Sequence, residues 1–197
     1  MNQLKRISVI AVIVLLGFAA VYFFWPRTVE LPKMASIDDP QLPSITGETD
    51  AFSSGKPKLV AFYYTQCPDV CPMTVIDLLR LQETLEGKGI QEKAYDVILI
   101  TLDPEVDTVD RIEQYKNQFD ITAGNWVFLR GTVEQTEQVT NQFNMVFQKD
   151  REGQIVHGTT MYVLDDENQI RAVHDMNTGQ AAVNVEQIAE HIDMLIK

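Results

Sequence analysis

Cysteine is scarce in this sequence, with only two among 197 residues. Two cysteines are too few for a disulfide-stapled scaffold, and a chain of this length can bury a hydrophobic core without cross-links. The length also limits the chain to one sizeable domain. The two cysteines, Cys67 and Cys71, therefore need a chemical explanation.

Positive charge is scarce as well: the sequence has 16 lysines and arginines but 28 aspartates and glutamates, which gives a formal net charge of −12. Lys5 and Arg6 are the only charged residues before Pro26, and Glu30 is the first acidic residue, so the sequence from Pro26 onward carries about −14. Such a chain repels polyanions, which argues against nucleic acid as a partner. The sequence also lacks internal repeats and low-complexity tracts, so a repeat architecture is excluded.

One long hydrophobic run is present near the amino end, from Ile7 to Trp25, and no charged residue interrupts it. As a helix it would span about 28 Å, close to the hydrocarbon thickness of a bilayer. A cleaved signal peptide is the alternative, but its apolar region is usually about 7 to 15 residues long and ends at a small-x-small site. The best such site, Gly17 to Ala19, lies inside the run. We therefore expect an uncleaved, single-pass membrane anchor over residues 1–25.

The flanking charges predict the orientation of this anchor. Lys5 and Arg6 precede the run and should remain in the cytoplasm, which places the rest of the chain on the extracytoplasmic side of what we expect to be a bacterial cell membrane. No cysteine follows the run directly, so a lipoprotein anchor is excluded. Four of the eight prolines lie between Pro26 and Pro43, which predicts a semi-rigid spacer over residues 26–41 and a folded domain over residues 42–197.

The order of predicted elements in the domain indicates an α/β fold. Short apolar runs predict buried strands, and stripes of apolar residues predict helices that begin at Pro72, at Thr108, at the capping box Thr132–Gln135 and at Val185. The strands are expected at 58–64, 96–102 and 126–129, followed by a hairpin of 160–164 with 170–173. This order is typical of a thioredoxin-like fold, a central mixed sheet flanked by helices.

Both cysteines fall in Cys67-Pro68-Asp69-Val70-Cys71-Pro72, at the junction between the first buried strand and its helix. The N–H groups and dipole of a helix start favour thiolates over thiols, so both sulfurs are disposed to act as nucleophiles or metal ligands. Their spacing allows either a disulfide or a shared metal ion. Asp69 lies inside this loop, either as negative charge beside a cation or as a turn residue.

Of the three histidines, His157 precedes the strand 160–164, at the loop that faces the cysteine loop in a thioredoxin-like fold. Ordinary thioredoxin-like reductases have a cis-proline near this position, but this sequence has no proline between Asp150 and Leu164. An imidazole there favours metal ligation over peptide docking. His174 and His191 are weaker candidates for metal ligands, and we expect both to be solvated.

Two thiolates and one imidazole form a soft donor set of low coordination number. This set suits Cu(I), and Cu(II) if a further oxygen ligand is present, whereas zinc would take the same residues with a water. A zinc hydrolase is disfavoured because no general-base carboxylate is clearly positioned with the set. Asp103 ends the neighbouring strand, where it is either a partner of the ligands or a solvated residue.

Three segments resemble the Sco (SenC) family of membrane-anchored copper proteins. They are Phe62 to Thr74 around the cysteines, Leu102-Asp103-Pro104 with Asp107-Thr108, and His157 to Tyr162. The resemblance implies one copper per chain, as Cu(I), Cu(II) or both, bound by Cys67, Cys71 and His157. It further implies a metallochaperone that serves the CuA centre of cytochrome c oxidase and meets the oxidase subunit that carries this centre.

Two other functions use the same residues. A thiol-disulfide oxidoreductase would keep the cysteines of the oxidase subunit reduced, with Cys67 and Cys71 as its redox pair. A copper or redox sensor would signal through a partner. A peroxiredoxin is disfavoured because its motif needs Pro and Thr where this sequence has Val60 and Tyr64.

Overall fold

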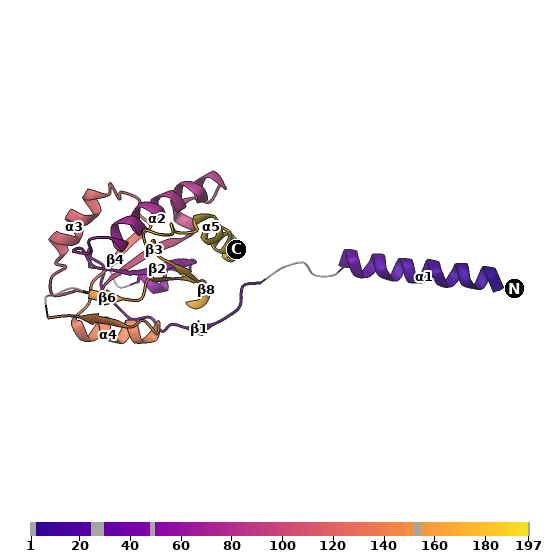
Figure 1. Cartoon of the computed structure of the whole chain (residues 1–197), viewed down its shortest axis with the longest axis horizontal. Helices are drawn as coiled ribbons and strands as arrows, with labels where there is room; N and C mark the ends of the chain where they lie inside the picture. The colour runs from indigo at the N-terminus through magenta and orange to yellow at the C-terminus, as the bar shows by residue number, and fades with distance from the viewer. Residues whose placement is uncertain (1–2, 25–29, 48–49, 152–154, 197) are drawn as a thin grey trace. The chain divides into compact units, whose positions relative to one another are not determined.

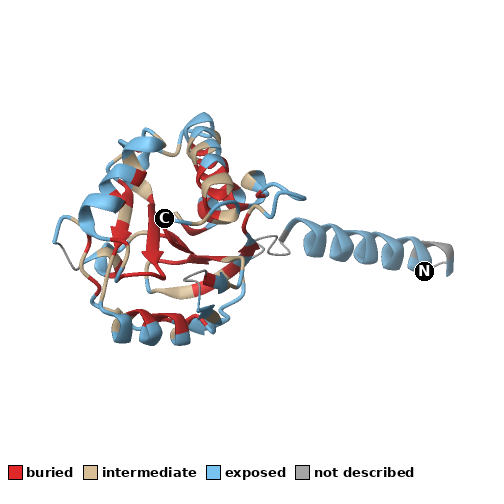
Figure 2. Ribbon diagram, turned by 60° about the vertical axis from the view of Figure 1, so that its left-hand side comes forward, coloured by how far each residue is buried: buried red, intermediate tan, exposed pale blue. Residues whose placement is uncertain are grey.

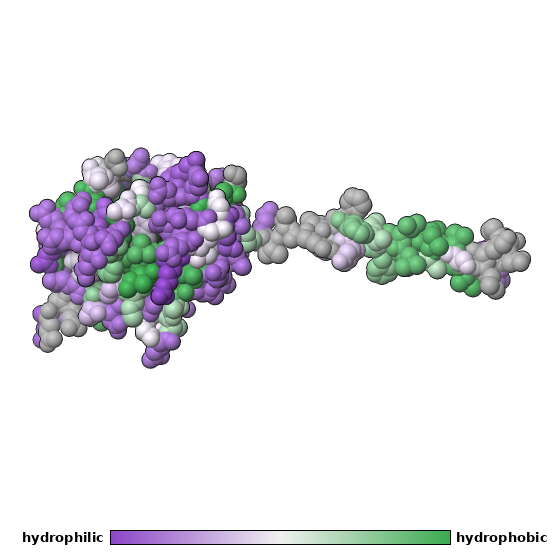
Figure 3. All heavy atoms as spheres, turned by 90° about the horizontal axis from the view of Figure 1, so that it is seen from above, coloured by the Kyte–Doolittle hydropathy of each residue, from purple (hydrophilic) through white to green (hydrophobic). Residues whose placement is uncertain are grey.

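The structure is a computed structural model that describes residues 3–24, 30–47, 50–151 and 155–196. It divides the chain into two compact units, Met1–Glu30 and Leu31–Lys197. The first unit contains helix α1 (Gln3–Phe24), in which Arg6–Phe23 is long and apolar enough to cross a membrane, with a mean hydropathy of 2.3. Figure 3 shows the apolar side chains that cover this helix. The predicted end of the anchor at Trp25 and the start of the spacer, residues 26–29, lie outside the described residues.

The second unit is built on a six-stranded sheet of order β1-β8-β7-β2-β3-β4. Strands β2, β3 and β4 are parallel, whereas β7, β8 and β1 add to one side as antiparallel neighbours, so the sheet is mixed as predicted. The six strands are β1 (Ala35–Ser36), β2 (Lys58–Tyr63), β3 (Asp96–Thr101), β4 (Trp126–Leu129), β7 (Thr160–Leu164) and β8 (Gln169–Asp175). Two 3₁₀ turns, Ala51–Ser53 and Glu92–Ala94, precede β2 and β3.

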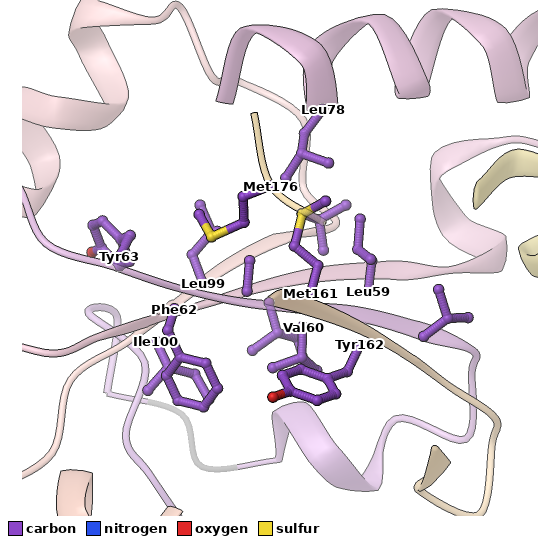
Figure 4. Packing of buried hydrophobic residues seen from close by; sticks show 14 of the residues in the cluster. Leu59, Val60, Phe62, Tyr63, Leu78, Leu99, Ile100, Met161, Tyr162 and Met176 are labelled. Carbon is purple, nitrogen blue, oxygen red and sulfur yellow. The ribbon is translucent and has the colours of Figure 1, made fainter. Parts of the chain in front are cut away.

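Helices cover both faces of this sheet, as Figures 1 and 2 show: α2, α3 and α5 lie on one face and α4 on the other. The helices are α2 (Val70–Gly87), α3 (Val109–Gln118), α4 (Val133–Gln142) and α5 (Val185–Leu195). Alternate strand residues serve the two layers, since successive side chains of a strand point to opposite faces. In Figure 4, Leu59 and Met161 lie on the side of Leu78 from α2, whereas Phe62 and Tyr162 point to the opposite side.

Local sequence explains where the helices begin. In α4, the Thr132 side chain accepts from the N–H of Gln135, and the Gln135 side chain accepts from the N–H of Thr132, so the predicted capping box is confirmed. Thr108 caps α3 in the same way, through the N–H of Arg111. Pro72 occupies the first turn of α2, where a missing N–H costs nothing.

The residues from Leu31 onward belong to the folded unit, so its structural start differs from the boundary predicted at residue 42. Strand β1 pairs with β8, and Ile37 is buried just beyond it. The Arg171 side chain also donates to the Leu31 carbonyl. Backbone pairing and the burial of one isoleucine fix a segment that its prolines had marked as a spacer.

The same segment reaches the far edge of the sheet. Ser44 forms a bridge with Leu129 of β4, and the N–H of Ile45 donates to the Phe128 carbonyl over 3.0 Å. The N–H of Arg130 donates in turn to the Pro43 carbonyl over 3.0 Å. Residues that precede β2 therefore contact strands on both sides of the sheet, β8 through β1 and β4 through Pro43 to Ile45.

A separate two-stranded sheet, which the sequence analysis did not predict, carries His157. It pairs β5 (Phe147–Lys149) with β6 (Ile155–His157), and Phe147 lies opposite His157. Both strands have three residues and mix polar with apolar side chains, which leaves too little periodicity to recognise. This sheet, termed the β5–β6 hairpin below, brings the histidine to the domain's cysteine end.

Candidate metal centre

The two cysteines lie together where β2 gives way to α2. Cys67 is partly exposed in the connecting loop, whereas Cys71 is 1% exposed in the first turn of the helix. The N–H of Cys71 donates to the Cys67 sulfur over 3.4 Å, and both thiols are free. The strand-to-helix turn therefore places the two sulfurs side by side, as the motif predicts.

The surroundings make these two sulfurs unequal. A hydrogen bond from the Cys71 side chain, supported by the N–H groups of Asp69 and Cys71, lowers the pKa of Cys67 to about 5. The same contact with Cys67, together with burial, raises the pKa of Cys71. Cys67 is therefore a thiolate at neutral pH, ready to bind a cation or attack a disulfide, while Cys71 keeps its proton until a metal or an oxidant displaces it.

A buried carboxylate holds the cysteine loop, and its role was missed in the sequence analysis. Asp107 is 1% exposed and accepts from the N–H of Thr65 at 3.1 Å and from the Thr65 hydroxyl at 2.5 Å. It also accepts from the Thr101 hydroxyl at the end of β3. Burial raises the pKa of Asp107, and its three donors oppose that shift. The sequence contains Asp107 in a motif, but only the fold shows which loop it fixes.

Tyr64 connects the cysteine loop to the β5–β6 hairpin. Its ring meets the His157 ring edge-on, with centroids 6.1 Å apart, and its hydroxyl donates to the Ile155 carbonyl over 3.3 Å. Its backbone carbonyl accepts from the N–H of Cys67 over 3.2 Å. Tyr64 is thus a further residue of the site, and nothing in the sequence pattern distinguishes it from a core aromatic.

The hydrogen bonding of His157 leaves one ring nitrogen, Nε2, for a metal ion. Its Nδ1 lies 2.8 Å from the carbonyl oxygen of Gly158. Because a carbonyl only accepts hydrogen bonds, Nδ1 carries the hydrogen and Nε2 presents its lone pair. This tautomer suits a metal ligand whose other nitrogen is held by the backbone.

The two predicted aspartates, Asp69 and Asp103, differ in exposure and in partners. Asp69 precedes α2 with an exposed side chain that makes no capping hydrogen bond, and its backbone N–H is the group that faces Cys67. Asp103 is buried and forms an ion pair with Lys149 of β5, with 2.8 Å between Oδ1 and Nζ. Asp103 therefore fastens the β5–β6 hairpin to the end of β3.

Within the described part of the chain, no three His, Cys, Asp or Glu side chains converge closely enough to hold a metal ion as they stand. The donor chemistry nevertheless fits a soft metal: Cys67 and Cys71 are adjacent, and the His157 ring packs against Tyr64, three residues before Cys67 in the chain.

The expectation that His174 and His191 are solvated is wrong for His174, which is buried, whereas His191 is partly exposed. His174 is 7% exposed on the inner face of β8, and its Nε2 lies 3.0 Å from Nδ1 of His191 in α5. Burial and the neighbouring imidazole lower the pKa of His174 to about 4. The alternation of strand residues turns His174 inward with Ala172 and Met176, whereas Asp175 points to solvent.

A cleft of about 460 Å³ adjoins the β5–β6 hairpin on the side away from the cysteines' helix. One face of α4, the loop after β3 and strand β5 form its walls, which include Asp103, Glu105, Thr136, Met145 and Lys149. The Asp103–Lys149 ion pair lies in this wall. The hairpin that bears His157 therefore has open space on one side.

A mixed sheet with a Cys-x-x-x-Cys pair at the strand-to-helix turn and a histidine on a facing hairpin defines a thioredoxin-like domain with a candidate metal centre. The sequence matches the SCO1/SenC family over residues 45–196. The chain therefore belongs to the SCO1/SenC family, and the resemblance noted from its motifs is confirmed.

Sequence relatives agree with this assignment. A protein of Stutzerimonas stutzeri named as copper-binding is 27% identical over 122 residues, which cover 62% of this chain and 55% of that protein. The SCO2-like protein RC0895 of Rickettsia conorii is 27% identical over 185 residues, which cover 83% of this chain and 85% of that protein. The chain thus matches about half the length of the first relative and most of the second.

Solved structures show the same fold. A SCO1/SenC family lipoprotein from Bacillus anthracis superposes with a TM-score of 0.72 at 20% identity, over 82% of this chain and 95% of that one. ScoI of Arabidopsis thaliana, solved with copper bound, gives 0.65 at 23% identity, over 78% and 93%. BsSco, described with a disulfide switch and as a member of the Sco family of cytochrome c oxidase assembly proteins, gives 0.71 at 17% identity, over 84% and 97%. The predicted thioredoxin-like fold is confirmed.

Proposed function

We propose that this protein is a metallochaperone that binds one copper ion through Cys67, Cys71 and His157 and delivers it to the CuA centre of cytochrome c oxidase. The observation that carries the proposal is the donor set: a thiolate and a thiol are adjacent, and the imidazole of His157, whose Nδ1 is held by a backbone carbonyl, packs against Tyr64 just before the cysteine loop. Copper-bound Arabidopsis ScoI and the oxidase-assembly role in the description of BsSco support the choice of metal and of pathway.

Each ligand has its own part in this function. Cys67, already a thiolate, makes the first contact with copper, and Cys71 follows by losing its proton. His157 adds a borderline nitrogen ligand that suits both Cu(I) and Cu(II). A low-coordinate site at the edge of the domain can pass its ion to a partner, because the incoming ligands of the partner have open positions to attack.

The place of action follows from α1. In this proposal Arg6–Phe23 anchors the chain in a bacterial cell membrane and the domain works on the extracytoplasmic side, near the oxidase subunit that carries the CuA centre. Lys5 and Arg6 set that orientation.

The unequal sulfurs favour one competing function. A nucleophilic, low-pKa thiolate beside a buried thiol is also the arrangement of a thiol-disulfide oxidoreductase, in which Cys67 would attack a disulfide and Cys71 would resolve the mixed species. Such an enzyme would reduce the cysteines of the oxidase subunit before copper arrives.

His157→Ala separates the two functions, because copper binding needs all three donors whereas thiol exchange needs only the cysteines. We expect the affinity for copper to fall at least tenfold, which corresponds to about 1.4 kcal/mol, while Cys67 and Cys71 still form and release a disulfide. Competition with a Cu(I) chelator and thiol titration measure the two properties, and oxidase activity in cells measures the outcome. If His157→Ala cells assemble a fully active oxidase and Cys67→Ala cells do not, the chaperone function is refuted in favour of the reductase.

A further inference from the structure

Strand β5 has one edge that no other strand covers. The β5–β6 hairpin is a two-stranded sheet, so β6 pairs with one side of β5, and the other side has no strand neighbour among the residues that the structure describes. A side-chain contact holds β5 in place, because the Lys149 ammonium pairs with the Asp103 carboxylate over 2.8 Å. The backbone on the outer side of β5 is therefore open to a further strand.

The register of the hairpin shows which backbone groups face this open edge. In an antiparallel pair, opposed residues alternate between pairs that exchange hydrogen bonds and pairs whose N–H and C=O groups point away from each other. The N–H of Gly158 donates to the Val146 carbonyl over 3.2 Å, so the next pair along, which contains Phe147, is of the second kind. The N–H and C=O groups of Phe147 and Lys149 therefore face outward, while those of Gln148 face β6.

The open edge of β5 borders the cleft of about 460 Å³. Phe147 and Lys149, whose backbone groups face outward, both line this cleft. On its other sides the cleft is bounded by α4 and by the loop after β3. An extended segment that lay in the cleft would therefore run beside β5, within reach of its outward N–H and C=O groups.

The walls opposite β5 are acidic. Glu105, from the loop after β3, and Glu137, from α4, line the cleft with exposed side chains. Neither carboxylate forms an ion pair with another described residue. The chain as a whole has a formal net charge of −12, which adds to the attraction of a cationic ligand. Lysine or arginine side chains on the segment in the cleft would therefore be favourable on the side that faces these walls.

The outer face of the hairpin is apolar and exposed. Val146, just before β5, is 81% exposed, and Val156 of β6 is 72% exposed. Val156 alternates with the buried Ile155, so its side chain lies on the face of the hairpin that points away from the core. A strand added to β5 would place every second side chain on this outer face and the others toward the cleft. Alternating apolar and basic side chains would match both.

We propose that the open edge of β5 and the adjoining cleft form a docking site for an extended segment of a partner protein in which apolar and basic side chains alternate, and that this segment adds to the hairpin as a third strand. Backbone hydrogen bonds supply affinity in this mode, and the alternation supplies specificity. Phe147 lies opposite His157, so the docked segment lies two strand spacings, about 10 Å, from the backbone of His157. The docking site does not depend on whether the cysteines bind copper.

A synthetic peptide tests this site on the full chain in detergent micelles. The probe is a peptide of alternating valine and lysine with blocked termini, about ten residues long. The matched peptide has the same composition, with all valines before all lysines. We expect saturable binding of the alternating peptide, about fivefold tighter than that of the matched peptide, because only the alternating order places apolar and basic side chains on opposite faces of a strand.

Amide hydrogen exchange at residue resolution locates the bound peptide. Exchange at Phe147 and Lys149 should slow by about tenfold or more when the alternating peptide binds, because their outward N–H groups gain acceptors. Exchange at Gln148, which already faces β6, should change little. This difference between adjacent residues separates strand pairing from a general stabilisation of the hairpin.

Two double variants with the same change in net charge test the acidic walls. Glu105→Gln with Glu137→Gln should weaken binding of the alternating peptide about fivefold, since two exposed ion pairs are lost. The control is Glu83→Gln with Glu113→Gln, in which the exposed glutamates belong to α2 and α3 on the other face of the sheet. The control should weaken binding less than about twofold.

Every other outcome overturns the docking site. Equal binding of the two peptides would reduce the interaction to charge attraction, and equal losses for the two double variants would remove the cleft from it. Protection that falls on β1 instead of β5 would place the peptide on the edge of the main sheet. A wild-type chain that does not bind the alternating peptide would refute the docking site and leave the proposed copper function untouched.

Discussion

Asp107→Ala is the most informative perturbation of the cysteine loop that leaves every proposed ligand in place. Asp107 is buried and accepts from three donors, the N–H and the hydroxyl of Thr65 and the hydroxyl of Thr101. Thr65 lies two residues before Cys67, so this carboxylate fixes the chain just ahead of the first sulfur. The substitution removes that restraint without touching copper chemistry directly.

The magnitude follows from the donors that lose their partner. The two hydroxyls can rotate toward other acceptors, but the Thr65 N–H cannot, and a buried donor without a partner costs about 1 to 3 kcal/mol. The hydrogen bonds that the charged carboxylate accepted are lost as well, which adds to this cost. Part of the cost is offset because the variant no longer buries a carboxylate, a burial unfavourable enough to raise the pKa of Asp107. We expect a net loss of about 3 kcal/mol in the free energy of unfolding. Asp107→Asn, which keeps one carbonyl acceptor, should lose about half as much.

Urea unfolding at pH 7 and Cu(I) competition measure the two effects, and Asp165→Ala is the control. Asp165 is also buried, accepts from the N–H groups of Glu167 and Gln169, and pairs with Arg171, but it lies in the turn between β7 and β8. Both alanine variants should lose stability, whereas only Asp107→Ala should lose copper affinity, by about tenfold or more. An Asp107→Ala protein that is within 1 kcal/mol of wild type, or that binds copper as well as Asp165→Ala does, would show that the reasoning is wrong.

Two further predictions concern ionisable groups. Because burial lowers the pKa of His174 to about 4, the unfolded chain takes up the proton first as the pH falls from about 6.5, so wild type should lose about 2 kcal/mol of stability between pH 7 and pH 5 through this residue. Urea unfolding of His174→Gln at both pH values should show a smaller loss by that amount, and identical losses would contradict the burial argument. Because the pKa of Cys67 is lowered to about 5, its alkylation by iodoacetamide should reach half of its maximal rate near that pH. In Cys71→Ala the midpoint should move upward toward that of an ordinary thiol, since the largest cause of the shift is removed; a wild-type midpoint above pH 7 would refute the assignment.

The parts of the fold that sequence reasoning predicted are those with strong local signals. Strand β4 begins and ends where predicted, and β2 and β3 differ by one residue at their ends, because runs of apolar residues between turn signals leave little alternative. The capping box of α4 depends on two neighbouring side chains and needs no tertiary information. The β5–β6 hairpin and β1 escaped notice because strands of two or three residues are too short to show a periodicity, and β1 in addition pairs with a strand far along the chain.

In the candidate site too, the features that the sequence predicted are those with local signals. The spacing of Cys67 and Cys71 and their place before a helix predict two adjacent, activated sulfurs. The structure brings them together and lowers the pKa of Cys67, but it raises the pKa of the buried Cys71. Asp107 and Tyr64 act on the site through long-range packing, so their roles depend on which elements meet in space. His174 was misjudged because its polar neighbour Asp175 suggested solvent, although a strand turns adjacent residues to opposite faces.

The segment before β2 also governs how copies of this protein meet. A β-sheet normally offers two open edges to other chains, and anchoring many copies in one membrane would raise their local concentration. Here β1 pairs with the first residues of β8, and Pro43 to Ile45 lie along β4, so one stretch of chain covers part of each edge. A shortened protein that began at Ile45, where the family match starts, would lose the β1 pairing and the Ile37 contact and expose the outer edge of β8. Such a protein would be prone to aggregate through strand-to-strand pairing. The segment that precedes β2 therefore protects the domain against self-association.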